Sequence, residues 1–148
     1  MGWSKWLFGT AITFFSCVSY PSEKSCEALE EYFLGAKSNF VDLKMRKSSV
    51  GDWVPKIYLP QANRCSIIDD EAGGSEAKCF YMFLDENDRR VGIRQIRMAV
   101  ASCLGWDEVD IISSERHSFN GADGVNISIS PFGRFDAYIS IEYVGNAK

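Results

Sequence analysis

Two segments of the chain carry apolar residues at steps of three and four positions, the spacing of one face of a helix. The first helix should begin near Ser25 and end around residues 44–47, where basic side chains suit a helix C-terminus. The second should run from Arg89 to Leu104 and end at Gly105, with Trp106 folding back onto the core. The apolar positions are Cys26, Leu29, Phe33, Ala36 and Phe40 in the first segment, and Ile93, Ile96, Val100, Cys103 and Leu104 in the second.

Strands are predicted where apolar residues alternate, or form short runs, between turn residues. The expected ranges are 53–59, 65–68, 78–84, 109–112, 125–129 and 135–143. Glycines near position 73 and residues 131–134 supply two hairpin turns, whereas Pro55 indicates an edge strand or a bulge. Residues 78–84 are apolar in both alternating sets, which indicates a strand that is central in the sheet or covered on both faces. The order α-β-β-β-α-β-β-β predicts an α+β fold, a mostly antiparallel sheet with two helices packed on it.

The N-terminus has the three-part pattern of a secretory signal. Lys5 precedes an uncharged run from Trp6 to Phe15, after which small and charged residues return. The apolar run is shorter than the roughly 20 residues that span a bilayer. We expect cleavage after Ser19, which leaves residues 20–148 as a single α+β domain. Lipidation of Cys17 in a lipoprotein signal, or a buried N-terminal helix or strand, are the alternatives.

The cysteine count fits export. The chain has five cysteines, and either cleavage or lipidation takes Cys17 out of the count, so that four remain. Cys65 and Cys79 would lie directly opposite each other in a hairpin centred near residue 72, close enough for a disulfide. Cys26 and Cys103 each lie on the apolar stripe of a predicted helix, which favours a second bond between them. Free thiols in a cytosolic protein are the alternative; a zinc site has less support, because the sequence has no CxxC pair.

Three arginines form the clearest candidate binding group. Arg90, Arg94 and Arg97 fall on one face of the second predicted helix, about a quarter turn from its apolar stripe. Such a row can bind carboxylates or phosphates, or can simply form the soluble edge of a helix. The formal net charge of −4 argues against general binding to nucleic acid or to an anionic membrane.

Histidine-based catalysis would have to use His117, the single histidine of the chain. It lies in the polar stretch SSERHSF, close in sequence to Ser113, Ser114 and Ser118. The sequence lacks a GxSxG nucleophile elbow, and neighbours in sequence rarely form a catalytic triad. We therefore interpret His117 as a solvated loop histidine.

Other motifs are better explained by structure than by chemistry. Residues 85–89 resemble the start of a calcium loop, but Arg89 falls at the third ligand position, so a helix-capping loop fits better. Residues 69–71 indicate a solvated acidic turn. The sequence has no glycine-rich phosphate loop and no dinucleotide motif, and we expect no cofactor and no bound metal. Asn126-Ile-Ser128 fits the N-glycosylation sequon but falls in a predicted strand.

Four features occur in a fixed order along the chain: Cys26 at the start of a helix, Leu59-Pro60 before Cys65, Cys79 in an aromatic strand, and the motif from Ala101 to Trp106. This order resembles that of a loose group of small exported bacterial proteins of uncharacterised function. The resemblance implies a periplasmic or lipoprotein location and no particular activity. We expect a non-enzymatic binding protein of the cell envelope, such as an inhibitor or immunity-type protein. Its partner would be another protein or a small ligand, and it would meet the membrane only through a lipid anchor. The alternative is a small envelope hydrolase that uses His117.

Overall fold

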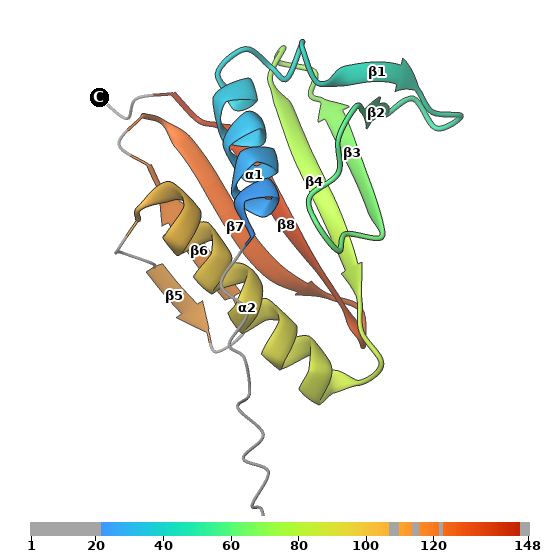
Figure 1. Cartoon of the computed structure of the whole chain (residues 1–148). Helices are drawn as coiled ribbons and strands as arrows, with labels where there is room; N and C mark the ends of the chain where they lie inside the picture. Colours follow the sequence, from blue (N-terminus) through green and yellow to red (C-terminus); the bar gives the residue numbers. More distant parts are fainter. Residues whose placement is uncertain (1–21, 107–109, 114–115, 122, 146–148) are drawn as a thin grey trace, which may run out of the picture.

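The computed structural model describes residues 22–106, 110–113, 116–121 and 123–145. In this part of the chain, two helices pack on one face of an eight-stranded antiparallel sheet (Figure 1). The helices are α1 (Glu23–Ala36) and α2 (Glu86–Leu104). The strands are β1 (Lys44–Lys47), β2 (Trp53–Pro55), β3 (Arg64–Asp69), β4 (Ser75–Met82), β5 (Asp110–Ser113), β6 (Arg116–Asn120), β7 (Val125–Phe132) and β8 (Asp136–Tyr143). The predicted α+β class is confirmed.

The sheet consists of two meanders joined at its centre. The strand order is β1-β2-β3-β4-β8-β7-β6-β5, so β4 and β8 are the junction, and each set of four strands follows one helix. The predicted element order lacks β1 and β6. The expectation that residues 78–84 form a central strand is correct, because β4 lies between β3 and β8.

The first helix ends earlier than its apolar spacing predicts. It ends at Ala36, and Asn39 and Phe40 have φ values of 53° and 55°, in the left-handed region. The Phe40 amide donates to the Gly35 carbonyl at 2.7 Å, which closes the turn. Phe40 is therefore buried by a chain reversal, and not by continuation of the helix. The residues expected at the helix end form β1 instead.

Polar side chains cap the N-termini of both helices, and a glycine ends the second helix. Ser22 caps α1, and the Asp85 carboxylate accepts from the Asn87 and Asp88 amides at the start of α2. Gly105 has φ 65° and terminates α2 as predicted. Trp106 then returns to the core as expected, where its ring centroid lies 5.4 Å from that of Phe33.

Both predicted disulfides are present. Cys26–Cys103 joins α1 to α2, and Cys65–Cys79 joins directly paired residues of β3 and β4. The expectations for the signal segment and for Cys17 fall outside the described residues.

The proline in β2 marks an irregular pairing. Pro55 pairs with Lys44 next to a register shift in β1. The bulge expected from this proline is consistent with that shift, whereas an edge position is not, because β2 lies between β1 and β3.

Candidate binding surfaces

One face of the sheet is left uncovered by the helices. Side chains alternate between the two faces along each strand. In β4, Cys79 and Tyr81 are buried beneath the helices, while Phe80 and Met82 point to the opposite face. Both helices lie on the near side of the sheet in Figure 1. We call the other side the open face.

The open face carries an exposed aromatic patch, defined by Phe80, Met82, Phe132 and Tyr138. The ring centroid of Phe80 lies 5.7 Å from that of Phe132 and 5.9 Å from that of Tyr138. Phe132 is 55% exposed and Met82 is 68% exposed. The Arg64 guanidinium lies 4.9 Å from the Phe80 ring centroid, within the range of a cation–π contact. Three neighbouring strands, β4, β8 and β7, thus supply one apolar patch with a cation at its edge.

The remainder of the open face is a ladder of polar contacts. Lys78 forms an ion pair with Glu76, and the Ser140 hydroxyl donates to Glu76. The Asn126 amide donates to Glu142 at 3.1 Å, so the nitrogen of the sequon is engaged within the sheet. The polar side chains of this part of the face therefore bond to one another, in contrast to those of the aromatic patch.

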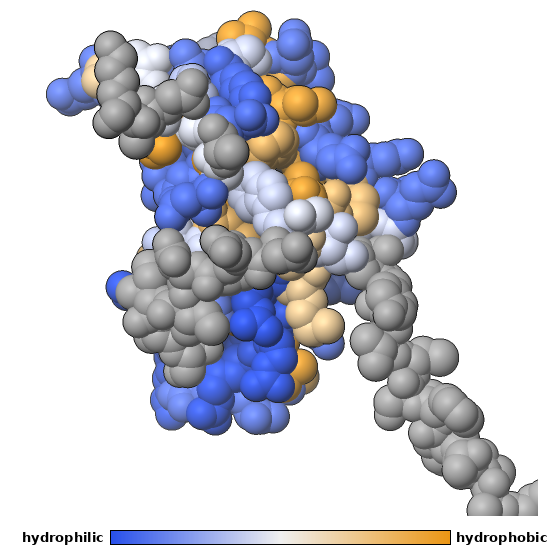
Figure 2. All heavy atoms as spheres, turned by 90° about the vertical axis from the view of Figure 1, so that its left-hand side faces the viewer, coloured by the Kyte–Doolittle hydropathy of each residue, from blue (hydrophilic) through white to orange (hydrophobic). Residues whose placement is uncertain are grey.

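The predicted arginine row lies on the surface of α2. Arg90 and Arg94 are exposed and Arg97 is half-buried. Among the described residues, none of the three forms an ion pair with a carboxylate. Seen from the left-hand side of Figure 1, the lower end of the described surface is mostly hydrophilic, and hydrophobic residues run from the top of the molecule down through its middle (Figure 2).

The interpretation of His117 as a solvated loop residue is wrong. His117 lies in β6, is 5% exposed, and pairs with Ile129 of β7. It shares the helix-covered face with Phe119, whereas Ser118 points to the open face and donates to the Asn126 side chain at 3.1 Å. Alternation therefore directs His117 and Ser118 to opposite sides of the sheet. The side chain of Ser113 and residue Ser114 lie outside the described part.

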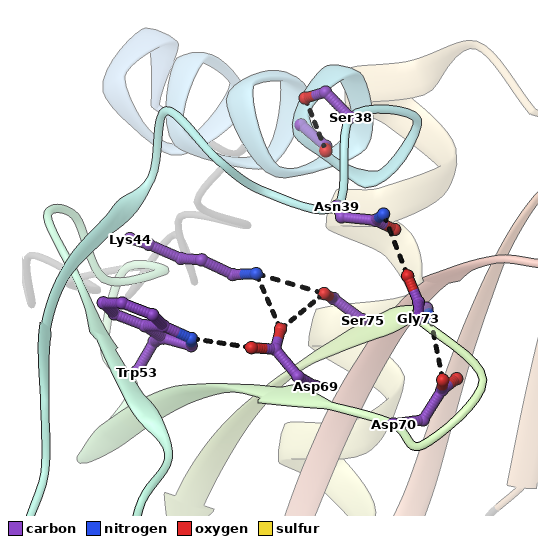
Figure 3. A network of polar contacts seen from close by, with 10 residues as sticks. Ser38, Asn39, Lys44, Trp53, Asp69, Asp70, Gly73 and Ser75 are labelled. Atoms are coloured by element: carbon purple, nitrogen blue, oxygen red, sulfur yellow. Dashed lines mark hydrogen bonds and ion pairs between the residues drawn. The ribbon is translucent and has the colours of Figure 1, made fainter.

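A polar network ties the first four strands together (Figure 3). The Asp69 carboxylate of β3 accepts from Lys44 of β1 at 2.6 Å, from Ser75 of β4 at 2.7 Å and from the Trp53 indole of β2 at 2.8 Å. These hydrogen bonds, led by that from Lys44, lower the pKa of Asp69 from 3.8 to about 2. Residues 69–71 were expected to form a solvated acidic turn, but Asp69, the first of them, is hydrogen-bonded to three other strands.

The same network brings a lysine close to a serine. The Lys44 amine lies 3.2 Å from the Ser75 hydroxyl, the spacing of a serine–lysine catalytic pair. Lys44 donates this hydrogen bond to Ser75 and also donates to the Asp69 carboxylate at 2.6 Å, so it acts here as a donor and not as a base toward the hydroxyl. The network is therefore a structural clamp across four strands.

A groove, possible metal ligands and possible membrane spans were the remaining features to consider in the described part of the chain. A shallow groove of about 420 Å³ lies between α1 and the segment after β2. Its lining residues are Lys24, Glu27, Ala28, Glu31, Ile57, Tyr58 and Pro60. The described residues contain no cluster of side chains able to hold a metal ion, and neither described helix is long and apolar enough to cross a membrane.

The chain matches no family model, and comparisons with curated proteins and with solved structures give no match. The fold and surfaces define a two-layer α+β protein with one open sheet face. Its two disulfides are compatible with an oxidising, exported environment.

The aromatic patch was not predicted from the sequence. The sequence feature that could have indicated it is the run at residues 78–84, which is apolar in both alternating sets. A strand of this kind directs half of its apolar side chains away from the helices. The run was interpreted as a sign of central position, which is correct. The same run also contains Phe80 and Met82, two of the four residues of the patch.

Proposed function

We propose that the chain is an exported protein of the cell envelope that binds another protein through the aromatic patch of its open face. The observation that carries this proposal is the group of adjacent rings formed by Phe80, Phe132 and Tyr138, with Met82 on the same face that the helices leave uncovered. Single exposed apolar residues are common on protein surfaces, whereas contiguous patches mark interaction sites.

The composition of the patch suits a protein partner. Aromatic residues, methionine and arginine are enriched at protein interfaces, and a few such residues supply most of the binding energy. Phe132 and Met82 provide accessible apolar area, and Arg64 provides a cation beside the Phe80 ring. The small size, the two disulfides and the acidic net charge suit an inhibitor or immunity-type protein that acts outside the cytosol.

The alternative of a hydrolase gains no support from the geometry. A base must reach the proton that it removes, either directly or through one water molecule. His117 is buried on the helix-covered face, and Ser118 lies on the other face. We therefore favour binding over catalysis.

Patch variants provide the test. Met82→Ser and Phe132→Ser combined remove two exposed apolar side chains, and Val50→Ser removes one that is 80% exposed in the turn after β1. Equal amounts of the tagged wild-type chain and of both variants are incubated with envelope extract, and the captured proteins are quantified by mass spectrometry. We expect one protein to be captured by the wild type and by Val50→Ser, and lost at least about tenfold with the double variant. Equal capture by all three chains would overturn the proposed site.

Export is tested separately. The N-terminus of the chain recovered from cells should begin at Tyr20 or at a lipidated Cys17. Retention of Met1 would contradict the proposed location without bearing on the patch.

A further inference from the structure

The two helices carry opposite charge on their outward faces. The solvent-facing side of α1 carries four exposed glutamates and one exposed lysine. From Arg90 to its end, α2 contains three arginines and no acidic residue. The glutamates are Glu23, Glu27, Glu30 and Glu31, and the arginines are Arg90, Arg94 and Arg97. The layer of helices is therefore acidic on one side and basic on the other.

These charges do not neutralise each other within one molecule. Ion pairs of the described residues include Lys37–Asp123, Lys44–Asp69 and Lys78–Glu76, and within the described part of the chain neither a glutamate of α1 nor an arginine of the row forms one. The reason is the orientation of α2. Cys103 faces α1 through its disulfide, and Arg94 precedes it by nine residues, or about two and a half turns. The row therefore points away from α1.

Exposed apolar residues lie among these charges. Leu34 of α1 is 65% exposed, while Val91 and Met98 of α2 are 44% and 50% exposed. Helical spacing places Leu34 on the same face as Glu27 and Glu31, seven and three residues before it. The outward surface of the helices thus combines complementary charge with apolar contact area.

We propose that a second copy of this chain binds to the helix layer about a two-fold axis, so that α1 of each copy contacts α2 of the other. A two-fold interface joins the same surface of both copies, and complementarity is met when that surface carries both charges in separate places. In this arrangement the dimer has two contacts, and at each of them the glutamate face of one copy meets the arginine face of the other. The open face of the sheet stays free in both copies, so this inference is independent of the proposed function.

The size of the helix layer determines the expected strength. Helices of 14 and 19 residues are about 21 Å and 28 Å long, so two side by side present about 500 Å² per copy. A total of about 1,000 Å² is at the lower limit of specific interfaces. The dimer should therefore be weak, and its dissociation constant should increase with salt, because its charges are exposed.

Charge reversal tests the arrangement. Sedimentation velocity is measured on the exported, disulfide-bonded chain as a function of concentration, at low ionic strength and at about 1 M salt, where the Debye length is about 3 Å. We expect a concentration-dependent dimer at low salt that dissociates at high salt. Glu27→Arg with Glu31→Arg, and separately Arg90→Glu with Arg94→Glu, should each weaken dimerisation at least about tenfold, because each change sets like charges opposite each other.

Mixing the two variants distinguishes this interface from others. A heterodimer of the two restores opposite charges at both contacts, so the mixture should dimerise as the wild type does. Arg46→Glu with Lys47→Glu on β1 is the matched control for charge and should leave the dimer intact. A wild-type chain that stays monomeric at low salt, or a mixture that stays monomeric, would overturn the proposal. Binding of the monomeric wild type to anionic lipid vesicles would assign the arginines to a membrane surface, which also overturns it.

Discussion

Removal of the bond between α1 and α2 should cost a large part of the stability of the fold. The perturbation is the double substitution Cys26→Ala with Cys103→Ala. Both side chains are half-buried, so the change leaves little empty volume in the core. The bond acts mainly on the unfolded chain, in which it closes a loop between residues 77 positions apart.

The magnitude follows from the loop length. On the chain-entropy relation, a closed loop of this length contributes about 4.5 kcal/mol at 25 °C, compared with about 3 kcal/mol for the shorter Cys65–Cys79 loop. Domains of this kind have a total free energy of unfolding of about 5–15 kcal/mol. We therefore expect the variant to lose between about 3 and 4.5 kcal/mol, and the urea m value to rise as the unfolded chain expands.

Urea unfolding at 25 °C under oxidising conditions measures this loss. Trp106 is a suitable fluorescence probe, because its ring packs against Phe33 and Phe119 in the native state. Mass determination must first show that the wild type carries no free thiols and that the variant retains Cys65–Cys79. A loss below about 1 kcal/mol, with an unchanged m value, would refute the reasoning that this bond constrains the unfolded chain.

Three further substitutions test separate contacts. Tyr32→Phe removes the hydroxyl that donates to the Ile57 carbonyl at 2.7 Å, and thermal unfolding should report a loss of about 1–3 kcal/mol because the acceptor stays part-buried. Asp69→Asn should reduce stability at neutral pH, and its difference from wild type should shrink as pH falls from 3.8 toward 2, because a lowered folded pKa stabilises only while the carboxylate is ionised. Gly92→Ala would place a Cβ 2.1 Å from Phe83, and the displaced ring should cost about 1–3 kcal/mol, more than the helix propensity gained.

Each of these has a matched control at an exposed position. Tyr58→Phe and Asp42→Asn make the same chemical changes where the side chain faces solvent, and Ser102→Ala places an alanine at an exposed position of α2. All three should leave stability within about 0.5 kcal/mol of wild type. If a test variant loses no more stability than its control, the contact that it removes does not stabilise the fold.

Local patterns predicted the disulfides and the mostly antiparallel sheet correctly, but they could not predict the order of the strands within the sheet. Cys65 and Cys79 could be paired because a hairpin sets its own register, and Cys26 and Cys103 because helix stripes point to the core. The pairing of β4 with β8 joins segments that are far apart in the sequence, so the pattern of residues within either strand does not indicate it. The location of the open face depends on that pairing and on where the helices pack, so the aromatic patch could not be predicted as exposed.

Two errors have specific causes. The predicted first helix is too long, because apolar spacing gives no sign of the left-handed backbone at Asn39 and Phe40. Such conformations are uncommon outside glycine. β6 was missed because only His117 and Phe119 of its five residues are buried, too few for alternation to stand out from a polar stretch.

The order of the strands also determines when the chain can acquire its cross-links. β1 to β4 are sequential neighbours, so the first meander can form as soon as its own residues are available, with little loop-closure entropy. Cys65 and Cys79 lie within that meander, whereas Cys26 must wait for α2, which follows it along the chain. If the chain folds from its N-terminus onward, the two disulfides should therefore form in a fixed order. The short-range bond closes first, and the long-range bond then secures the helices before β8 completes the sheet.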